Sequence, residues 1–285
     1  MSRPPPPSRR PKRALGQNFL VDGNIQRRIV DVAAIEPDDA VVEIGPGRGA
    51  LTGLLAERAG QLTLVELDDL LAAELEERFR DIDHVRVLHA DILETRLSAI
   101  SSDPSSLRVI GNIPYNITTP ILFHLLEAPR PADILLMVQK EVAERIAAVE
   151  GTSGYGALSV GVQTVAEVET LLRVPPGAFR PRPRVDSAVI RIRPIRPFPL
   201  SRDEEHRLRR LTRAAFQWRR KQLRRTLRDH PDLALPPARL ERLGETLDLE
   251  RRPETLSPTE FVELSRWLFA ESPESDPSAR RDVDG

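Results

Sequence analysis

The stretch AVVEIGPGRG, residues 40–49, decides the fold expected for this chain. Residues 40–44 form a mainly apolar run that predicts a buried strand, and the glycines predict a sharp turn into the helix that follows. Gly45 and Gly47 would let the main chain approach a ligand that any side chain would keep away. The spacing differs from the GxGxxG pattern of dinucleotide sites, so the loop alone identifies no ligand.

The next two apolar runs end in acidic residues. Glu66 ends the run LTLVE (62–66), and Asp91 follows the run VRVLHA (85–90). The carboxyl ends of parallel strands meet at one edge of an open α/β sheet, where a carboxylate can bind ribose hydroxyls or an adenine amine. The alternative for each acid is that it caps the helix that follows it.

The glycine loop and these two acids together favour a nucleoside ligand. The sequence lacks the P-loop motif that holds nucleoside triphosphates. An adenosine-bearing ligand without phosphates is S-adenosylmethionine, whose positive sulfonium favours nearby carboxylates such as Glu43. We therefore expect S-adenosylmethionine as the cofactor.

The segment GNIPY, residues 111–115, follows a fourth apolar run. An enzyme that methylates the adenine amine must hold its N–H bonds, because the N6 lone pair is delocalised into the ring. The side-chain carbonyl of Asn112, with a main-chain carbonyl exposed by Pro114, can accept two such bonds, and Tyr115 can stack on the base. The alternative is an ordinary junction between a strand and a turn.

Phe179 lies in a loop rich in proline and arginine, residues 175–187, between two stretches whose alternation predicts an antiparallel pair of strands. An aromatic ring in such a loop would be poorly buried, which favours a second stacking face for a flipped base, opposite Tyr115. The alternative is that Phe179 anchors its loop in the core.

Basic residues are concentrated in one segment. The net charge is −1, from 42 Lys and Arg against 43 Asp and Glu, so the overall balance predicts no nucleic-acid partner. Residues 206–228, however, contain many arginines and no acid, which indicates that one face meets an anionic polymer. The alternative is a solvated helix face in an arginine-rich sequence.

Several classes of protein are excluded by composition. The chain has no cysteine, and its 5 histidines show no metal-ligand spacing, so we expect no metal site. No apolar run approaches the roughly 20 residues of a membrane span, and no apolar region of a secretory signal follows the basic N-terminus. We expect a cytoplasmic protein without a membrane partner.

These patterns predict an α/β, Rossmann-like methyltransferase domain followed by a small C-terminal all-α domain. The expected boundaries are a disordered basic arm at 1–12, the S-adenosylmethionine-dependent domain at 13–197, a helical RNA-binding domain at 198–270 and a disordered tail at 271–285.

With these residues in hand, the sequence closely resembles the small-subunit ribosomal RNA adenine-N6,N6-dimethyltransferase family. The matching stretches are LGQNFL (15–20), VEIGPGRGALT (42–52), VEL (65–67), ADIL (90–93), GNIPYNI (111–117), FRPRPRVDSAV (179–189), AFQWRRKQLRRTL (215–227) and RPETLSPTEF (252–261). They occur in the family's order. One departure is Ile113, where leucine is more usual, and both residues are apolar.

The resemblance implies a role for each matching residue. Asn18 and Leu20 close over the cofactor, Gly45 and Gly47 form its loop, Glu66 holds the ribose, Asp91 holds the cofactor adenine, and Asn112, Pro114 and Tyr115 hold the target base. Asn112 also belongs to the cofactor-binding set. Phe179 matches the second stacking aromatic of the family.

The resemblance also implies a reaction and a partner. The expected reaction is dimethylation of the N6 amines of two adjacent adenines in the 3′-terminal hairpin loop of 16S ribosomal RNA. The expected partner is an immature 30S-type subunit, bound by a monomer. No DNA partner is expected, because no target-recognition domain separates the motifs.

Two alternatives come from other classes. A related large-subunit rRNA adenine methyltransferase would share the glycine loop and the segment around Asn112. The stretches LGQNFL, VDSAV and AFQWRRKQLRRTL instead resemble the small-subunit group. A non-catalytic ribosome assembly factor on the same fold would bind RNA without methylating it, and the intact Asn112, Pro114 and Tyr115 disfavour that alternative.

Overall fold

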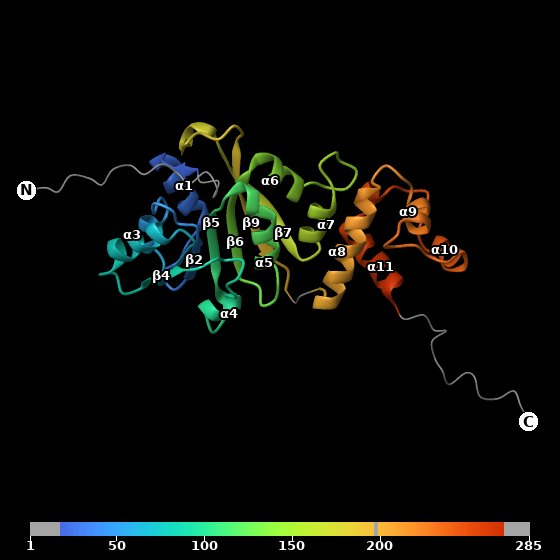
Figure 1. Ribbon diagram of the computed structural model, residues 1–285, viewed down its shortest axis with the longest axis horizontal. Coiled ribbons are helices and arrows are strands. Elements are labelled where there is room, and N and C mark those ends of the chain that lie inside the picture. The colour runs from blue at the N-terminus through green and yellow to red at the C-terminus, as the bar shows by residue number, and fades with distance from the viewer. Residues whose placement is uncertain (1–17, 197–198, 271–285) are drawn as a thin grey trace, which may run out of the picture. The chain divides into compact units, whose positions relative to one another are not determined.

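The computed structural model describes residues 18–196 and 199–270, so the predicted arm at 1–12 and tail at 271–285 lie outside the described residues. The described chain divides into two compact units (Figure 1). The first unit contains the chain up to residue 147 together with residues 165–198, and the second contains residues 148–164 and the chain from residue 199 onward.

A seven-stranded sheet forms the centre of the first unit, in the order β4-β3-β2-β5-β6-β9-β7. Its strands are β2 (Ala40–Ile44), β3 (Gln61–Glu66), β4 (Val85–His89), β5 (Arg108–Asn112), β6 (Asp133–Gln139), β7 (Ala166–Val174) and β9 (Ser187–Pro194). Strands β2 to β6 are parallel, whereas β9 runs antiparallel to both β6 and β7. This topology confirms the predicted Rossmann-like fold and brings the carboxyl ends of β2 to β5 to one edge.

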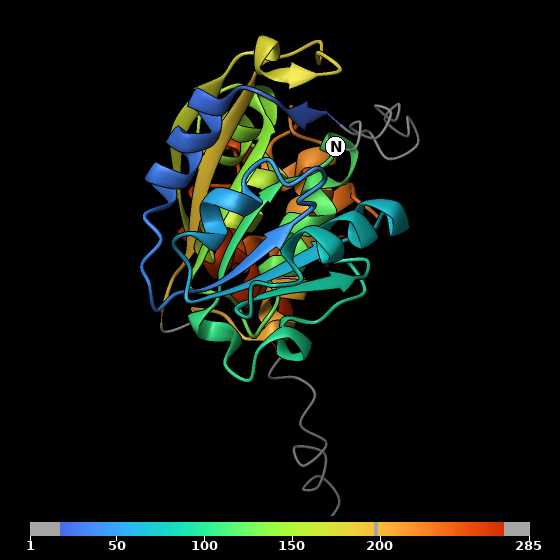
Figure 2. The same cartoon turned by 90° about the vertical axis from the view of Figure 1, so that its left-hand side faces the viewer.

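Helices cover the sheet, and Figure 2 views this unit from the side on which α3 and β4 lie in Figure 1. The helices of this unit are α1 (Gly23–Ala33), α2 (Thr52–Ala56), α3 (Asp69–Phe79), α4 (Leu97–Ile100), α5 (Thr118–Leu125) and α6 (Lys140–Ile146), with the 3₁₀ turns η2 (Pro104–Ser106), η3 (Tyr115–Ile117) and η4 (Pro176–Ala178). Ile29 of α1, Leu55 of α2 and Leu75 of α3 share one buried cluster with Leu64 of β3. Each such buried side chain stabilises the fold by about 1.5–3 kcal/mol.

A second, two-stranded sheet lies beside this core. It pairs β1 (Phe19–Leu20) with β8 (Phe179–Arg180) in antiparallel register, with Leu20 opposite Phe179. Asp22 caps α1 by accepting hydrogen bonds from Asn24 N and Ile25 N, so the chain turns directly from β1 into α1. This pairing joins the beginning of the described chain to the loop that precedes β9.

The second unit is helical within the residues that the structure describes. Its elements are α7 (Ala157–Gln163), α8 (Arg202–Gln217), α9 (Leu223–Asp229), α10 (Pro237–Gly244), η5 (Pro253–Thr255) and α11 (Pro258–Phe269). Ser201 and Ser257 begin α8 and α11 with capping boxes. The ring of Phe216 packs against Tyr155 and Phe261, and the Tyr155 hydroxyl donates to the Leu256 carbonyl at 2.8 Å. Residues 148–164 therefore contribute to this helical core.

None of the described helices has the length and apolar character needed to span a bilayer.

Candidate active site

The glycine loop leaves β2 in a conformation that glycine adopts readily and other residues do not. Gly45 and Gly47 have φ angles of 62° and 58°, in the left-handed region that side chains disfavour. The N–H of Gly45 donates to the Val65 carbonyl at 2.9 Å. A Cβ atom at Gly47 would lie 3.3 Å from the Phe19 ring. The loop thus combines a left-handed turn with a close approach to β1, and both features require glycine.

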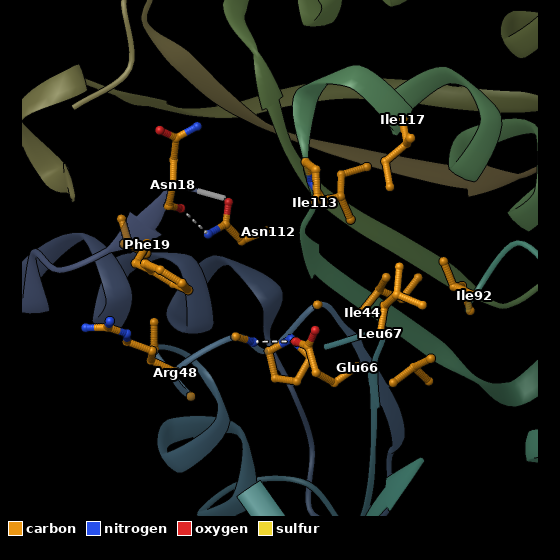
Figure 3. A pocket seen from close by; sticks show the side chains of 18 of the residues that line it. Asn18, Phe19, Ile44, Arg48, Glu66, Leu67, Ile92, Asn112, Ile113 and Ile117 are labelled. Carbon is orange, nitrogen blue, oxygen red and sulfur yellow. Dashed lines mark hydrogen bonds between the residues drawn. The ribbon is translucent and has the colours of Figure 1, made fainter. Parts of the chain in front are cut away.

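Glu66 is the last residue of β3, and the main chain holds both of its carboxylate oxygens. Oε2 accepts a hydrogen bond from Gly47 N at 2.9 Å (Figure 3), and Oε1 accepts one from Asp68 N at 2.9 Å. Burial raises the pKa of Glu66, while these two hydrogen bonds oppose the rise. Glu66 does not cap α3, because Asp68 does so through Leu70 N and Leu71 N. Each Glu66 oxygen keeps a lone pair that can accept a hydroxyl.

A second carboxylate, Glu43, lies on β2 itself and is not part of the cavity lining. Its side chain is 2% exposed, and Thr52 Oγ1 donates to its Oε2 at 2.7 Å. Burial raises the pKa of Glu43 to about 7; the Thr52 hydrogen bond lowers it and the nearby Glu66 charge raises it. Glu43 is thus a buried carboxyl group behind the cavity lining, held by Thr52.

Asp91 follows β4 at the same edge of the sheet. Its Oδ1 accepts from Leu93 N at 2.8 Å, and its carbonyl accepts from Thr95 Oγ1 at 2.7 Å. Among the described residues no group bonds Oδ2 of Asp91. The residue therefore fixes its own turn and still offers one carboxylate oxygen to a ligand.

Asn112 ends β5, and β5 pairs in parallel with β2. Its Nδ2 donates to the Asn18 carbonyl at 3.4 Å, as Figure 3 shows. Because the amide nitrogen is directed at Asn18, Oδ1 is the atom that can accept from a ligand N–H. Pro114, with φ −58° and ψ 135°, then leads the chain out of the strand into η3.

Tyr115 begins η3, and its hydroxyl lies 2.6 Å from Ser187 Oγ at the start of β9. Ser187 is fully buried. Burial raises the pKa of the Tyr115 phenol, and the hydrogen bond with Ser187 opposes that rise. The hydrogen bond with Ser187 thus holds the hydroxyl of the neutral Tyr115 side chain. It fixes the direction of the Tyr115 ring, and Tyr115 also lines the cavity.

Phe179 is placed differently from the expectation that it faces a flipped base. Its side chain is 0% exposed and belongs to the same core cluster as Leu20 and Ala178. The physical reason is the β1–β8 pairing, which covers the loop that looked poorly buried in the sequence. The alternative that Phe179 anchors its loop in the core describes this arrangement, and the stacking role remains a prediction.

The predicted site residues other than Phe179 share one cavity of about 600 Å³. These are Asn18, Leu20, Gly45, Gly47, Glu66, Asp91, Asn112, Pro114 and Tyr115. They come from β1 and from the ends of four parallel strands, so the sheet topology itself gathers them. No cluster of potential metal ligands is found in the part of the chain that the structure describes.

The cavity also has lining residues that sequence reasoning did not assign. Leu67 lines it and is 46% exposed, and an apolar residue directly after a strand-end carboxylate was the available signal. Arg48 places its guanidinium 4.7 Å from the centre of the Phe19 ring, which holds β1 against the glycine loop. Arg180 lines the opening from β8. Neither arginine could be assigned without the β1–β8 pairing.

These residues fit S-adenosylmethionine. The glycine loop allows close approach of main-chain groups, and the oriented Glu66 carboxylate suits a ribose diol. Leu67 and Ile92 supply apolar surface for a planar base, with Asp91 beside them.

Comparison with known sequences gives a consistent result. The family described as ribosomal RNA adenine dimethylase matches residues 9–268. Ribosomal RNA small subunit methyltransferase A of Geobacter metallireducens is 42% identical, over 92% of this chain and 96% of its own length. The protein of the same description from Aromatoleum aromaticum is 43% identical, over 93% of this chain and 96% of its own length.

Solved structures agree with the fold. A dimethyladenosine transferase from Plasmodium falciparum superimposes with a TM-score of 0.76 at 26% identity, covering 86% of this chain and 95% of that one. The 23S rRNA methyltransferase ErmE gives a TM-score of 0.66 at 29% identity, covering 88% of this chain and 99% of that one.

Proposed function

The chain belongs to the ribosomal RNA adenine dimethylase family, and from this premise we propose that it dimethylates N6 of two adjacent adenines in the 3′-terminal hairpin loop of small-subunit 16S rRNA. The enzyme is an S-adenosylmethionine-dependent rRNA adenine dimethyltransferase. Its substrate is an immature 30S-type subunit in the cytoplasm, which it meets as a monomer.

The observation that carries this proposal is the direction of the Asn112 amide. With Nδ2 committed to the Asn18 carbonyl, Oδ1 would accept from a substrate amine, and the Ile113 carbonyl before Pro114 would be the second acceptor. Two acceptors hold both N–H bonds of an exocyclic amine and leave its lone pair directed away from them. The residues therefore act chiefly by orientation.

Tyr115 is suited to hold the base itself. Its ring lines the cavity and its hydroxyl is anchored to Ser187, so stacking on a base costs little side-chain entropy. A base must leave its stack to reach this cavity, and the stacking contact compensates part of that cost.

S-adenosylmethionine supplies the electrophilic methyl group when it is bound. Glu66, Asp91 and the glycine loop are the groups that would hold it. No side-chain general base is needed, because the amine proton becomes acidic once nitrogen is methylated, and the acceptor carbonyls already bind it. A second methylation requires the monomethylated amine to rotate, and the cavity of about 600 Å³ offers space for that.

The large-subunit alternative has one observation in its favour, the similarity of this fold to ErmE. The relatives over 40% identical carry the small-subunit description, which supports the proposal over this alternative.

The test is transfer of labelled methyl from S-adenosylmethionine to unmethylated small subunits and, in a parallel reaction, to large subunits, followed by mass analysis of the RNA nucleosides. Dimethyladenosine confined to small-subunit RNA is expected. Label in large-subunit RNA would support the ErmE-like alternative. Tight subunit binding without label would support a non-catalytic assembly factor.

A further inference from the structure

The helical unit contains a second cavity, of about 240 Å³, where α8 ends and before α9 begins. We call it the Trp218 cavity; its lining residues are Gln217, Trp218, Arg219, Arg220, Lys221 and Arg225. Four of these six residues are cationic and none is acidic. The lining therefore combines positive charge with one aromatic ring.

The cations of the Trp218 cavity are not equally available to a ligand. Arg219 is engaged by the Glu254 carboxylate and donates to the carbonyls of Ser153 and Thr152 at 2.8 and 3.0 Å. In the described part of the chain, no hydrogen bond or ion pair holds the side chains of Arg220 and Lys221, and both residues are exposed. Their charges are therefore uncompensated at the mouth of the cavity.

Arg225 is an intermediate case. Its Nε lies 3.8 Å from Asp229 Oδ2, and Asp229 also pairs with Arg228 at 2.7 Å. One carboxylate shared by two guanidinium groups leaves a net positive charge beside the cavity. Asp229 and Glu254 are the acids that pair with the lining residues Arg225 and Arg219.

Trp218 is held in a fixed direction. Its ring lies 5.1 Å from the His230 ring at 65°, and His230 is 3% exposed. His230 Nδ1 accepts from Asp232 N at 3.1 Å, so its proton is on Nε2, which lies 3.0 Å from Gln217 Oε1. Because both ring nitrogens are engaged, His230 is a rigid support for the indole, which is itself only half-buried.

We propose that the Trp218 cavity binds one nucleotide of an unpaired RNA segment. The indole stacks on the base, while Arg220 and Lys221 neutralise the adjoining phosphates. The cavity is smaller than the roughly 300–1,000 Å³ of a site that encloses a small molecule, which suits a single base stacked at its edge. Paired bases are already stacked inside a duplex, so the site selects single-stranded RNA. This inference rests on the proposed function for its RNA substrate, but adds a binding site outside the methyl-transfer cavity.

Tryptophan fluorescence tests the proposal directly, because Trp218 and Trp267 are the 2 tryptophans of the chain. In the Trp267→Phe variant, Trp218 is the sole indole. Hexauridylate, which contains no adenine and so accepts no N6 methyl group, should quench its emission, and the quenching should weaken as salt is raised. Tripolyphosphate, which has charge but no base, should not quench. Equal quenching by tripolyphosphate, or no quenching by hexauridylate, would overturn the proposal.

Variants separate stacking from charge. Trp218→Ala should weaken hexauridylate binding by about 5- to 100-fold, as the removal of one base–aromatic stack implies, whereas Trp218→Phe should retain most of the affinity. The double variant Arg220→Gln, Lys221→Gln should lower the slope of log affinity against log salt by about 0.7 for each phosphate that is no longer neutralised. Unchanged affinity in Trp218→Ala, with a native melting curve, contradicts the stacking role.

Methyl transfer to small subunits distinguishes this proposal from the proposed function. Trp218→Ala should raise KM for the subunit and leave kcat unchanged. If the unsubstituted enzyme transfers methyl groups but Trp218→Ala has an unaltered KM, the nucleotide site is wrong and the function stands. If hexauridylate quenches Trp218 but no methyl is transferred, the nucleotide site stands and the function is wrong.

Discussion

The cavity at the strand ends, where we propose that methyl transfer occurs, and the Trp218 cavity are built in different ways. The first is formed at the ends of parallel strands, where main-chain groups of Gly47 and Asp68 orient the carboxylate of Glu66. The second is formed by side chains at the junction of two helices, and Arg220 and Lys221 in its lining are exposed. Groups at a sheet edge are held in precise positions, as a reaction requires. Long cationic side chains are flexible, and they attract phosphates without a fixed geometry. Substitutions in the first should therefore change rates and cofactor binding, and substitutions in the second should change RNA affinity.

The largest effect is expected for Asn112→Ala. Removing Oδ1 removes one of the two acceptors that orient the amine, so methyl transfer should fall by at least about 10²–10³-fold, with subunit binding nearly intact. Radiolabel transfer and subunit co-sedimentation measure the two. The matched control is Asn24→Ala, an exposed asparagine outside the cavity lining. Equal loss of transfer and of subunit binding would remove the distinction between the cavities.

The next effect is expected for Glu66→Gln. An amide cannot accept from both Gly47 N and Asp68 N, so one N–H loses its partner and S-adenosylmethionine affinity should fall roughly 10- to 100-fold. Isothermal titration calorimetry gives the affinity, and the exposed Glu57→Gln is the control. Hexauridylate binding should not change. A normal cofactor affinity in Glu66→Gln would contradict the ribose assignment.

A smaller effect, and one confined to a pH window, is expected for Glu43→Gln. The folded-state pKa of Glu43 is raised from 4.5 to about 7 by burial, so the folded protein holds a proton that the unfolded chain has released. The free energy of unfolding of the parent protein should therefore fall as pH rises from 4.5 to about 7. By pH 8, Glu43→Gln should exceed the parent protein in free energy of unfolding by about 2 kcal/mol more than it does at low pH. Urea unfolding at pH 5, 6, 7 and 8 measures this.

The hydrogen bond from Thr52 supplies the control for that experiment. Because this bond lowers the pKa of Glu43, Thr52→Ala should move the window of falling stability to higher pH. Parallel stability curves for the parent and Glu43→Gln would show that Glu43 does not titrate in this range.

The smallest effects are expected for Arg219 and Arg220, two adjacent arginines that should differ in their contributions to stability and to RNA binding. Arg219 is bonded to Glu254 and to two carbonyls, whereas none of the residues that the structure describes bonds the exposed Arg220 side chain. Arg219→Gln should lower the free energy of unfolding by about 1 kcal/mol, and Arg220→Gln should leave it unchanged while weakening RNA binding. Chemical denaturation and hexauridylate titration report the two properties. Similar stability losses in both variants would mean that neither side chain is reserved for RNA.

The sequence predicts the strand-end part of the site well because the relevant signals are local. Glu66 and Asn112 each end an apolar run, and parallel strands in a Rossmann-like sheet must bring such ends together. The glycines of the loop are interpretable for the same reason, since Gly45 and Gly47 are needed by their own φ angles. The roles of these residues for a ligand remain predictions.

Other features depend on pairings between distant segments. Phe179 is buried because β8 pairs with β1, which begins 160 residues earlier in the chain at Phe19. Similarly, Arg219 belongs to the basic stretch in composition, but only its contacts with Glu254 and Thr152 show that it stabilises the helical unit. Periodicity and charge patterns carry no information about such partners.

Residues 148–164 limit how the two units of the molecule can be exchanged with those of another protein. The chain passes between its two units three times, because these residues join the helical unit and the strands β7 and β9 follow them. Exchanging everything after residue 198 for a foreign segment would leave Tyr155 without the Leu256 carbonyl that its hydroxyl now meets. The helical unit is therefore not encoded by one continuous C-terminal segment. A chimaera must carry residues 148–164 together with the chain from residue 199 onward.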